Sequence, residues 1–224
     1  MEYDRLIILP CHSIWKGQDT QHSQGQNSSE WFLASFQVEG QDHLCFIDHI
    51  KRSFEELKKS PRALLVISGG QTKSEAGPVS EALSYYQLAR RILAGPEFNA
   101  LFDRVVLEEY ARDSLENVLF SVCRFYEITA SYPEFITVVG FEFKRTRFLK
   151  YHLVEALNFP DSRVEYIGNS PTPGSDIDHE HYFSSLEASE QKHALEHFET
   201  DLYGIRNPPG EKGTERPIQE ASRV

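Results

Sequence analysis

Three basic residues stand close together at Lys144, Arg145 and Arg147, directly after an apolar segment that is typical of a buried strand. Lys144 and Arg147 are three residues apart, and i,i+3 neighbours on a helix share a face. A guanidinium fork combined with an ammonium group suits a phosphate or a carboxylate. The cluster therefore predicts a site for an anionic ligand. Two alternatives are a solvated helix start paired with Glu142 and a structural ion network with buried carboxylates.

A second candidate is the segment 68–72, Ser-Gly-Gly-Gln-Thr, which follows another apolar run and precedes a helical stretch that opens at Ser80. Strand, glycine turn and helix form the arrangement in which α/β proteins present backbone N–H groups to an anion. The alternative is a tight connection that only requires glycine. Neither a dinucleotide-binding Gly-x-Gly-x-x-Gly motif nor a P-loop is present. The ligand-binding residues expected here are Ser68, Gly69, Gly70, Thr72 and Ser80, with the amides of Gly69 and Gly70 as donors.

Three side chains could carry protons at the same edge of the fold: His12, Glu81 and Glu108. His12 follows the first strand, and a histidine titrates near neutral pH. Glu108 follows another strand directly and has no evident local structural task, whereas Glu81 could also serve as an acidic residue at a helix start. We expect these three residues to be catalytic.

Further polar residues lie between Glu108 and the next helix. They could bind the ligand or simply begin that helix, since aspartate and serine are preferred N-caps. The candidates are Arg112, Asp113, Ser114 and Asn117.

These side chains need a framework that brings strand ends together. The hydrophobic pattern predicts strands at 5–9, 63–67, 104–107, 135–139 and 163–167, and helices at 41–59, 80–94, 114–130 and 143–157. This alternation implies right-handed βαβ units in an α/β, three-layer Rossmann-like fold with a mainly parallel sheet of about five strands. We expect one domain over 1–206, a loop at 16–29 long enough to fold over a site, a weak helix at 185–200 and a disordered tail at 207–224.

Taken together, the motifs resemble the SanA/ElyC/YdcF-like family, a widespread domain of unassigned function. The matching residues are Ser68, Gly69, Gly70, Ser80, Glu81, Ala82, Glu108, Ala111, Glu116, Asn117 and Arg147, with Asp113 and Ser114 in place of the usual Asn and Thr. Lys144 stands where the family has a histidine, and Cys11-His12 with Glu30-Trp31 looks like the soluble fungal-type branch. The resemblance spans about residues 4–170, and it implies S-adenosylmethionine or another adenosine-type molecule as a possible ligand.

The charge and the cysteine content of the chain exclude several classes of binding partner. A net charge of −11 and a pI near 5.3 disfavour nucleic acid and anionic membranes, which require a positive field. The three cysteines have neither metal-type spacing nor a closed disulfide framework, which indicates a reducing, cytoplasmic location. Asp178-His179-Glu180-His181 lacks a third metal ligand at a diagnostic spacing, so no metal is expected.

Two classes of function follow. The first is an enzyme, a hydrolase or transferase, that acts on a phosphate-bearing or other anionic small molecule. The second is a non-catalytic protein that binds a nucleotide or S-adenosylmethionine. Mixed acids and bases in one cleft favour the enzyme, whereas the lack of an unmistakable nucleophile or cofactor motif favours the binder.

Overall fold

The computed structural model describes residues 2–17 and 23–203. Its centre is a five-stranded, all-parallel sheet in the order β3-β2-β1-β4-β5. The strands are β1 (Arg5–Pro10), β2 (Ala63–Ser68), β3 (Val105–Glu108), β4 (Phe135–Phe141) and β5 (Val164–Asn169). The α/β, Rossmann-like fold with a parallel sheet of five strands is confirmed.

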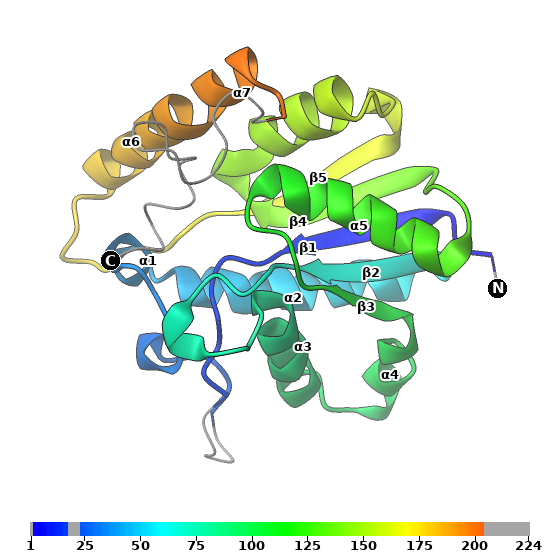
Figure 1. The fold of residues 1–224 in the computed structure, drawn as a ribbon. Helices are drawn as coiled ribbons and strands as arrows, with labels where there is room; N and C mark the ends of the chain where they lie inside the picture. Colours follow the sequence, from blue (N-terminus) through cyan, green and yellow to red (C-terminus); the bar gives the residue numbers. More distant parts are fainter. Residues whose placement is uncertain (1, 18–22, 204–224) are drawn as a thin grey trace.

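Helices cover both faces of the sheet (Figure 1). The long ones are α2 (Asp42–Lys59), α3 (Glu81–Ile92), α5 (Ser114–Thr129) and a π-helix over Arg147–Ala156, called here the 147–156 helix. Shorter helices are α1 (Ser35–Glu39) and α4 (Pro96–Asn99). A C-terminal helical arm comprises α6 (His179–Glu190), a π-helical turn (Gln191–Leu195) and α7 (Glu196–Thr200). Single 3₁₀ turns occupy Ser28–Glu30, Ser74–Ala76, Phe102–Arg104, Glu142–Lys144 and Asp161–Arg163.

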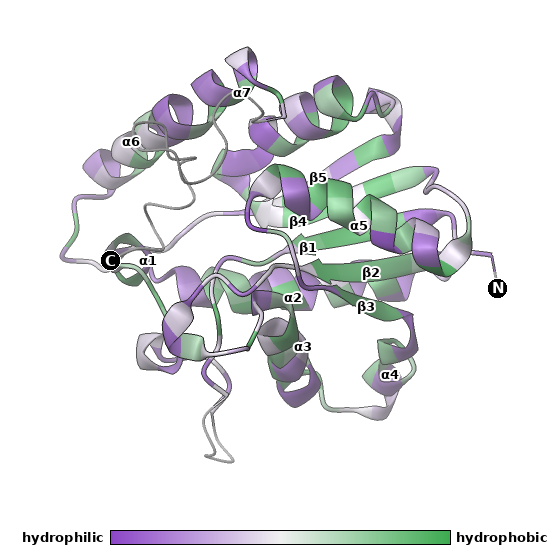
Figure 2. Ribbon diagram, viewed as in Figure 1, coloured by the Kyte–Doolittle hydropathy of each residue, from purple (hydrophilic) through white to green (hydrophobic). Residues whose placement is uncertain are grey.

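The core has two layers because successive strand side chains point to opposite faces. Ile7 and Ile67 join the apolar faces of α2 and α3, whereas Leu6 and Val66 join α5 and the 147–156 helix. The continuous apolar runs of the strands are visible in Figure 2, where the sheet is coloured hydrophobic. Strands buried on both faces are expected in a parallel sheet covered by helices.

The strand order reverses between β1 and β4. From β1 the chain goes outward to β2 and β3, and then crosses to β4 and β5 on the other side. In open α/β sheets, the loops after the two strands that flank such a reversal diverge and leave a crevice. His12 follows β1 and Lys144 follows β4, so this crevice is bounded by two of the predicted site residues.

Two predicted elements differ from the structure. The segment 143–157 is a 3₁₀ turn followed by the π-helix, not a single α-helix. The C-terminal helix begins at His179 rather than 185, because Asp178 caps it by accepting a hydrogen bond from the backbone N–H of His181. The tail at 207–224 lies outside the described residues. None of the described helices combines the length and apolar character needed to cross a bilayer.

Candidate functional site

A cavity of about 690 Å³ opens at the C-terminal edge of the sheet, at the β1/β4 reversal. Residues from α6 form one wall, and Figure 1 shows this helix, in orange, beside that edge. The predicted residues that line the cavity are His12, Thr72, Glu81, Arg112, Asp113, Ser114, Asn117, Lys144 and Arg147. The predicted residues outside its lining are Ser68, Gly69, Gly70, Ser80, Glu108 and Arg145.

Lys144 supplies a positive charge that no carboxylate among the described residues pairs with. Its Nζ lies 3.5 Å from His12 Nδ1 and 5.5 Å from the ring centroids of Phe141 and Phe143. Among the described residues, no carboxylate oxygen lies within ion-pair distance of this ammonium group. Burial, followed by the charge of Arg147, lowers the pKa of Lys144 to about 8, so the side chain is still mostly protonated at neutral pH.

His12 contacts Lys144 within the lining of the same cavity. Because an ammonium group only donates hydrogen bonds, His12 Nδ1 is the acceptor and the ring proton is on Nε2. That Nε2 is buried and has no hydrogen-bond partner among the described residues. Burial, with the charge of Lys144, holds the pKa of His12 well below its ordinary value. This geometry places a neutral imidazole against Lys144 at the predicted edge of the sheet.

Two carboxyl groups face the same cavity. Glu81 is 7% exposed and accepts a hydrogen bond from the Thr72 hydroxyl, while burial raises its pKa to about 7. Asp42, the first residue of α2, is 6% exposed, and burial raises its pKa to about 7 against the charge of Lys144. Sequence reasoning missed Asp42, although its position at a helix start close to an expected site was a usable signal.

Glu108 accepts hydrogen bonds that hold the local structure after β3. It accepts hydrogen bonds from the Ser68 hydroxyl at 2.5 Å and from the backbone N–H groups of Tyr110 and Ala111 at 2.6 and 3.1 Å. These bonds shape the loop after β3, and they also occupy Ser68. The expectation that Glu108 has no local structural task is therefore wrong.

The glycines serve close packing. The Gly69 amide donates to the Glu108 carbonyl at 3.0 Å and the Gly70 amide donates to the Ala111 carbonyl at 2.7 Å, so neither is available to a ligand. A Cβ at Gly69 would lie 2.8 Å from Cys11 Cβ, and one at Gly70 would lie 2.8 Å from the Ala111 carbonyl oxygen. The expected role of these amides as ligand donors is wrong, and the alternative of a tight connection is correct.

Helix capping accounts for two more candidates. The Ser80 hydroxyl accepts from the Leu83 N–H at 2.9 Å and caps α3, and Asp113 accepts from the Glu116 N–H at 2.9 Å and caps α5. Asp113 still lines the cavity, whereas Ser80 does not.

The other arginines are paired. Arg145 is not part of the cavity lining, and its Nε lies 2.6 Å from Glu142 Oε1. Arg112, which lines the cavity, pairs with Glu116. Arg147 is buried and forms a bidentate pair with Glu190 of α6, with its Nε 2.8 Å from Oε1 and its second contact joining Nη2 to Oε2. Within the described residues, the predicted basic cluster thus pairs through Arg145 with Glu142 and through Arg147 with Glu190, and not with Glu81 or Glu108.

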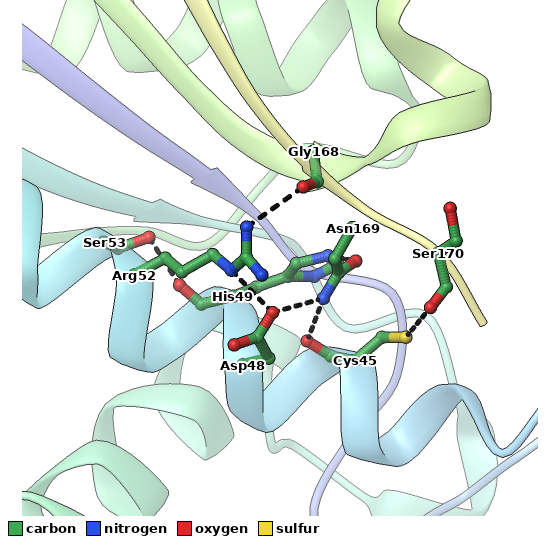
Figure 3. A network of polar contacts seen from close by, with 8 residues as sticks. All are labelled: Cys45, Asp48, His49, Arg52, Ser53, Gly168, Asn169 and Ser170. Atoms are coloured by element: carbon green, nitrogen blue, oxygen red, sulfur yellow. Dashed lines mark hydrogen bonds and ion pairs between the residues drawn. The ribbon is translucent and has the colours of Figure 1, made fainter. Parts of the chain in front are cut away.

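A polar network fixes the wall formed by α2. Asn169, at the end of β5, donates to the Cys45 carbonyl and to Asp48, while Arg52 donates to the Gly168 carbonyl at 3.1 Å (Figure 3). His49 binds the Asn169 side chain and packs edge-on against Phe141 with 5.0 Å between ring centroids. The network ties the first turns of α2, and with them Asp42, to the sheet edge.

The described part of the predicted covering loop lies elsewhere. Glu30 accepts hydrogen bonds from the Gly25 N–H at 2.7 Å and from the Asn27 side chain at 2.8 Å, and Trp31 Nε1 donates to the Gly25 carbonyl. None of residues 16, 17 and 23–29 lines the cavity, and residues 18–22 lie outside the described part. The wall opposite the sheet comes instead from α6, through residues such as Tyr182 and Ser185.

The histidines near Asp178 do not form a metal centre in the described structure. His179 contacts the Gly174 carbonyl, while His181 lines the cavity. Within residues 2–17 and 23–203, no three His, Cys, Asp or Glu side chains gather in an arrangement that could hold a metal ion.

Comparison with known proteins identifies a relative in budding yeast. The uncharacterized protein YOR238W of Saccharomyces cerevisiae is 34% identical over an alignment of 242 residues, which covers 90% of this chain and 80% of the yeast protein. No protein-family model matches the chain, and no solved structure matches it. The chain belongs to the same protein family as yeast YOR238W.

Proposed function

We propose that this protein is a small-molecule enzyme that binds an anionic, phosphate- or carboxylate-bearing metabolite in the cavity at the C-terminal edge of the sheet. The observation that carries the proposal is the Lys144 ammonium group, which faces the cavity without a carboxylate partner among the described residues. A buried cation costs free energy unless it is paired. An anionic group of the metabolite would supply the missing partner.

The two carboxyl groups supply proton transfer. A general acid or base works best when its pKa lies near the working pH, and the pKa values of Glu81 and Asp42 are both about 7. Each can therefore donate or accept a proton at neutral pH without a metal. His12 contributes by directing Lys144, since its Nδ1 accepts a hydrogen bond from the ammonium group.

Arg147 contributes positive electrostatic potential to the cavity, but not a guanidinium group that is free to bind the anion with two hydrogen bonds. Both arms of its guanidinium group that face Glu190 are occupied. In this proposal, Lys144 therefore makes the direct contact with the anion, and Arg147 forms part of the cavity wall.

The proposal extends to family and location. We place the chain with the SanA/ElyC/YdcF-like proteins on the strength of the residues quoted above, and we place it in the cytoplasm because its cysteines lack a disulfide framework. Its partner is a small molecule and not nucleic acid, since a net charge of −11 repels polyanions.

One observation favours a second function, the non-catalytic binding of a nucleotide or S-adenosylmethionine. The cavity lies at the reversal of strand order, which is where Rossmann-like sheets bind nucleotides. Phe36, Phe141 and Phe143 line it and could stack against an adenine ring.

The test is to identify what the protein retains. Native mass spectrometry of the purified chain, followed by denaturation and mass analysis of the released small molecules, gives the identity of a bound ligand. A phosphate- or carboxylate-bearing metabolite that is converted when incubated with the protein supports the enzyme. S-adenosylmethionine or a nucleotide that stays unchanged supports the binding protein. A Lys144→Met variant that retains the same ligand in the same amount contradicts both the anchoring role of Lys144 and the enzyme proposal.

A further inference from the structure

We propose that Ser114 is a nucleophile with His152 as its general base, so that the anionic substrate is a carboxylic ester whose acyl group passes through Ser114. This inference rests on the proposed function, because it assigns a reaction to the same cavity. It also supplies the nucleophile that the sequence motifs did not reveal.

The first support is the Ser114–His152 pair. Ser114 Oγ lies 2.8 Å from His152 Nε2, within the range of a hydroxyl that donates to an imidazole. Ser114 lines the cavity, whereas His152 is completely buried behind it. A serine hydroxyl at a cavity wall within hydrogen-bond distance of a histidine is the nucleophile–base part of the arrangement by which enzymes activate a hydroxyl group. The third, orienting group is not seen, because His152 Nδ1 has no hydrogen-bond partner among the described residues.

Arg147 favours the productive direction of that hydrogen bond. Its Nη1 lies 3.5 Å from Ser114 Oγ, and a guanidinium group can only donate. Ser114 therefore accepts from Arg147 and keeps its own proton for His152. The positive charge also favours the ionised form of the serine oxygen.

The π-helix makes the arrangement possible. Arg147 and His152 are five residues apart, and in an α-helix that spacing turns the two side chains about 140° away from each other. In a π-helix the repeat follows i→i+5 hydrogen bonds, so the two residues lie one turn apart on the same side. Both side chains consequently reach the same serine oxygen.

The start of α5 provides donors for the developing negative charge. The N–H of Glu116 already donates to the Asp113 side chain. The N–H groups of Ser114 and Leu115, in the first turn of α5, have no carbonyl acceptor within the helix. Such amides, at the positive end of a helix, can stabilise an oxyanion on the carbon bound to Ser114.

His152 has the protonation state that the reaction needs. Burial, with the charge of Arg147, holds the pKa of His152 well below its ordinary value, so the ring is neutral and able to accept a proton. The ion pair with Glu190 reduces, but does not cancel, the effect of the Arg147 charge on the imidazolium ion that forms.

The reaction then balances in two steps. Ser114 Oγ attacks the ester carbonyl carbon and its proton passes to His152 Nε2; the carbon–oxygen bond to the leaving alcohol breaks, and the alcohol takes that proton. Water next attacks the acyl-serine and gives a proton to His152. Ser114 leaves, regains the proton, and the products are a carboxylic acid and an alcohol. Lys144 holds an anionic group elsewhere on the same substrate.

The experiment treats the full chain with a fluorescent fluorophosphonate, which phosphonylates activated serines, and maps the modified peptide by mass spectrometry. We expect modification at Ser114, and loss of about 100-fold or more in labelling rate in Ser114→Ala and His152→Gln. The matched control is Ser121→Ala, because Ser121 is a buried serine on the same helix whose hydroxyl has no hydrogen-bond partner among the described residues. It should label like the parent protein.

Two results would overturn the inference: a parent protein whose Ser114 peptide stays unmodified, or a Ser114→Ala variant that labels at the parent rate. The first result is obtained on the parent protein alone, so it does not depend on whether a variant folds. Titration of inorganic phosphate into the parent and Lys144→Met proteins separates this outcome from the proposed function. Lys144-dependent phosphate binding without labelling at Ser114 would refute the nucleophile and leave the anion site standing.

Discussion

Arg147 and Glu190 form a bidentate ion pair whose side chains are only 6% and 5% exposed. It joins the 147–156 helix to the end of α6. Glu190 is the only buried residue of α6, whose larger apolar side chains, Tyr182, Phe183 and Leu186, are all partly exposed. The pair is therefore one anchor of α6, beside the packing of Ala194 and Phe198, farther along the same arm, against Leu115 and Tyr151.

The first prediction concerns that pair. Arg147→Ala leaves a buried carboxylate without a partner, and we expect a loss of about 3–5 kcal/mol in the free energy of unfolding, measured by urea denaturation. Arg145→Ala is the matched control, since it breaks an exposed pair with Glu142 and should cost less than about 1 kcal/mol. Equal, small losses in both variants would show that α6 is held by other contacts.

The second prediction concerns pH. The pKa of Glu81 in the folded protein is about 7, above its ordinary value of 4.5, so the folded state binds the proton more tightly than the unfolded chain does. The contribution of Glu81 to stability is then fully present below pH 4.5 and is lost as the pH rises through about 7. Glu81→Gln should remove this loss and raise the free energy of unfolding at pH 8 by roughly 3 kcal/mol.

Glu142→Gln gives a control of opposite sign for the pH series. The hydrogen bond from Arg145 holds the pKa of Glu142 below its usual range, so its contribution is present above pH 4.5 and is lost on acidification. Its removal should lower stability at pH 8 by less than about 1 kcal/mol. If Glu81→Gln also lowered stability at pH 8, the Glu81 carboxylate would be stabilising and its raised pKa would be refuted.

The third prediction concerns the glycine turn. Gly69→Ala and Gly70→Ala should each destabilise the fold by about 1–3 kcal/mol, because the new Cβ meets Cys11 Cβ or the Ala111 carbonyl at 2.8 Å. Gly95→Ala is the control, since its Cβ would meet only the flexible end of Glu97. Thermal melting of the three variants gives the comparison, and a Gly70→Ala variant as stable as Gly95→Ala would contradict the packing argument.

The regular elements were predictable because their sequence patterns are local. Alternating apolar strands and amphipathic helices gave the fold class, and parallel strands necessarily gather their C-terminal ends at one edge. That rule alone was enough to bring His12, Glu81 and Lys144 to a common cavity.

The partnerships within the site were not predictable, because they depend on contacts between distant residues. Glu190 lies 43 positions after Arg147, in a stretch predicted only as a weak helix, and nothing in the sequence connects the two residues. The sequence of 143–157 predicted an ordinary helix and did not reveal the π-helix, so the shared contact of Arg147 and His152 with Ser114 could not be foreseen. Glycines that serve close packing and glycines that approach a ligand also look alike in sequence, as Gly69 shows.

The central claim is that Lys144 anchors an anion, and titration calorimetry with inorganic phosphate and with sulfate tests it most directly. We expect the parent protein to bind, Lys144→Met to bind about 10- to 100-fold more weakly, and Lys150→Met, which removes an exposed lysine outside the cavity, to bind like the parent. Because the pKa of Lys144 is about 8, sulfate binding should weaken as the pH rises above that value. Equal binding by the parent and Lys144→Met, or no anion binding by the parent, would contradict the account.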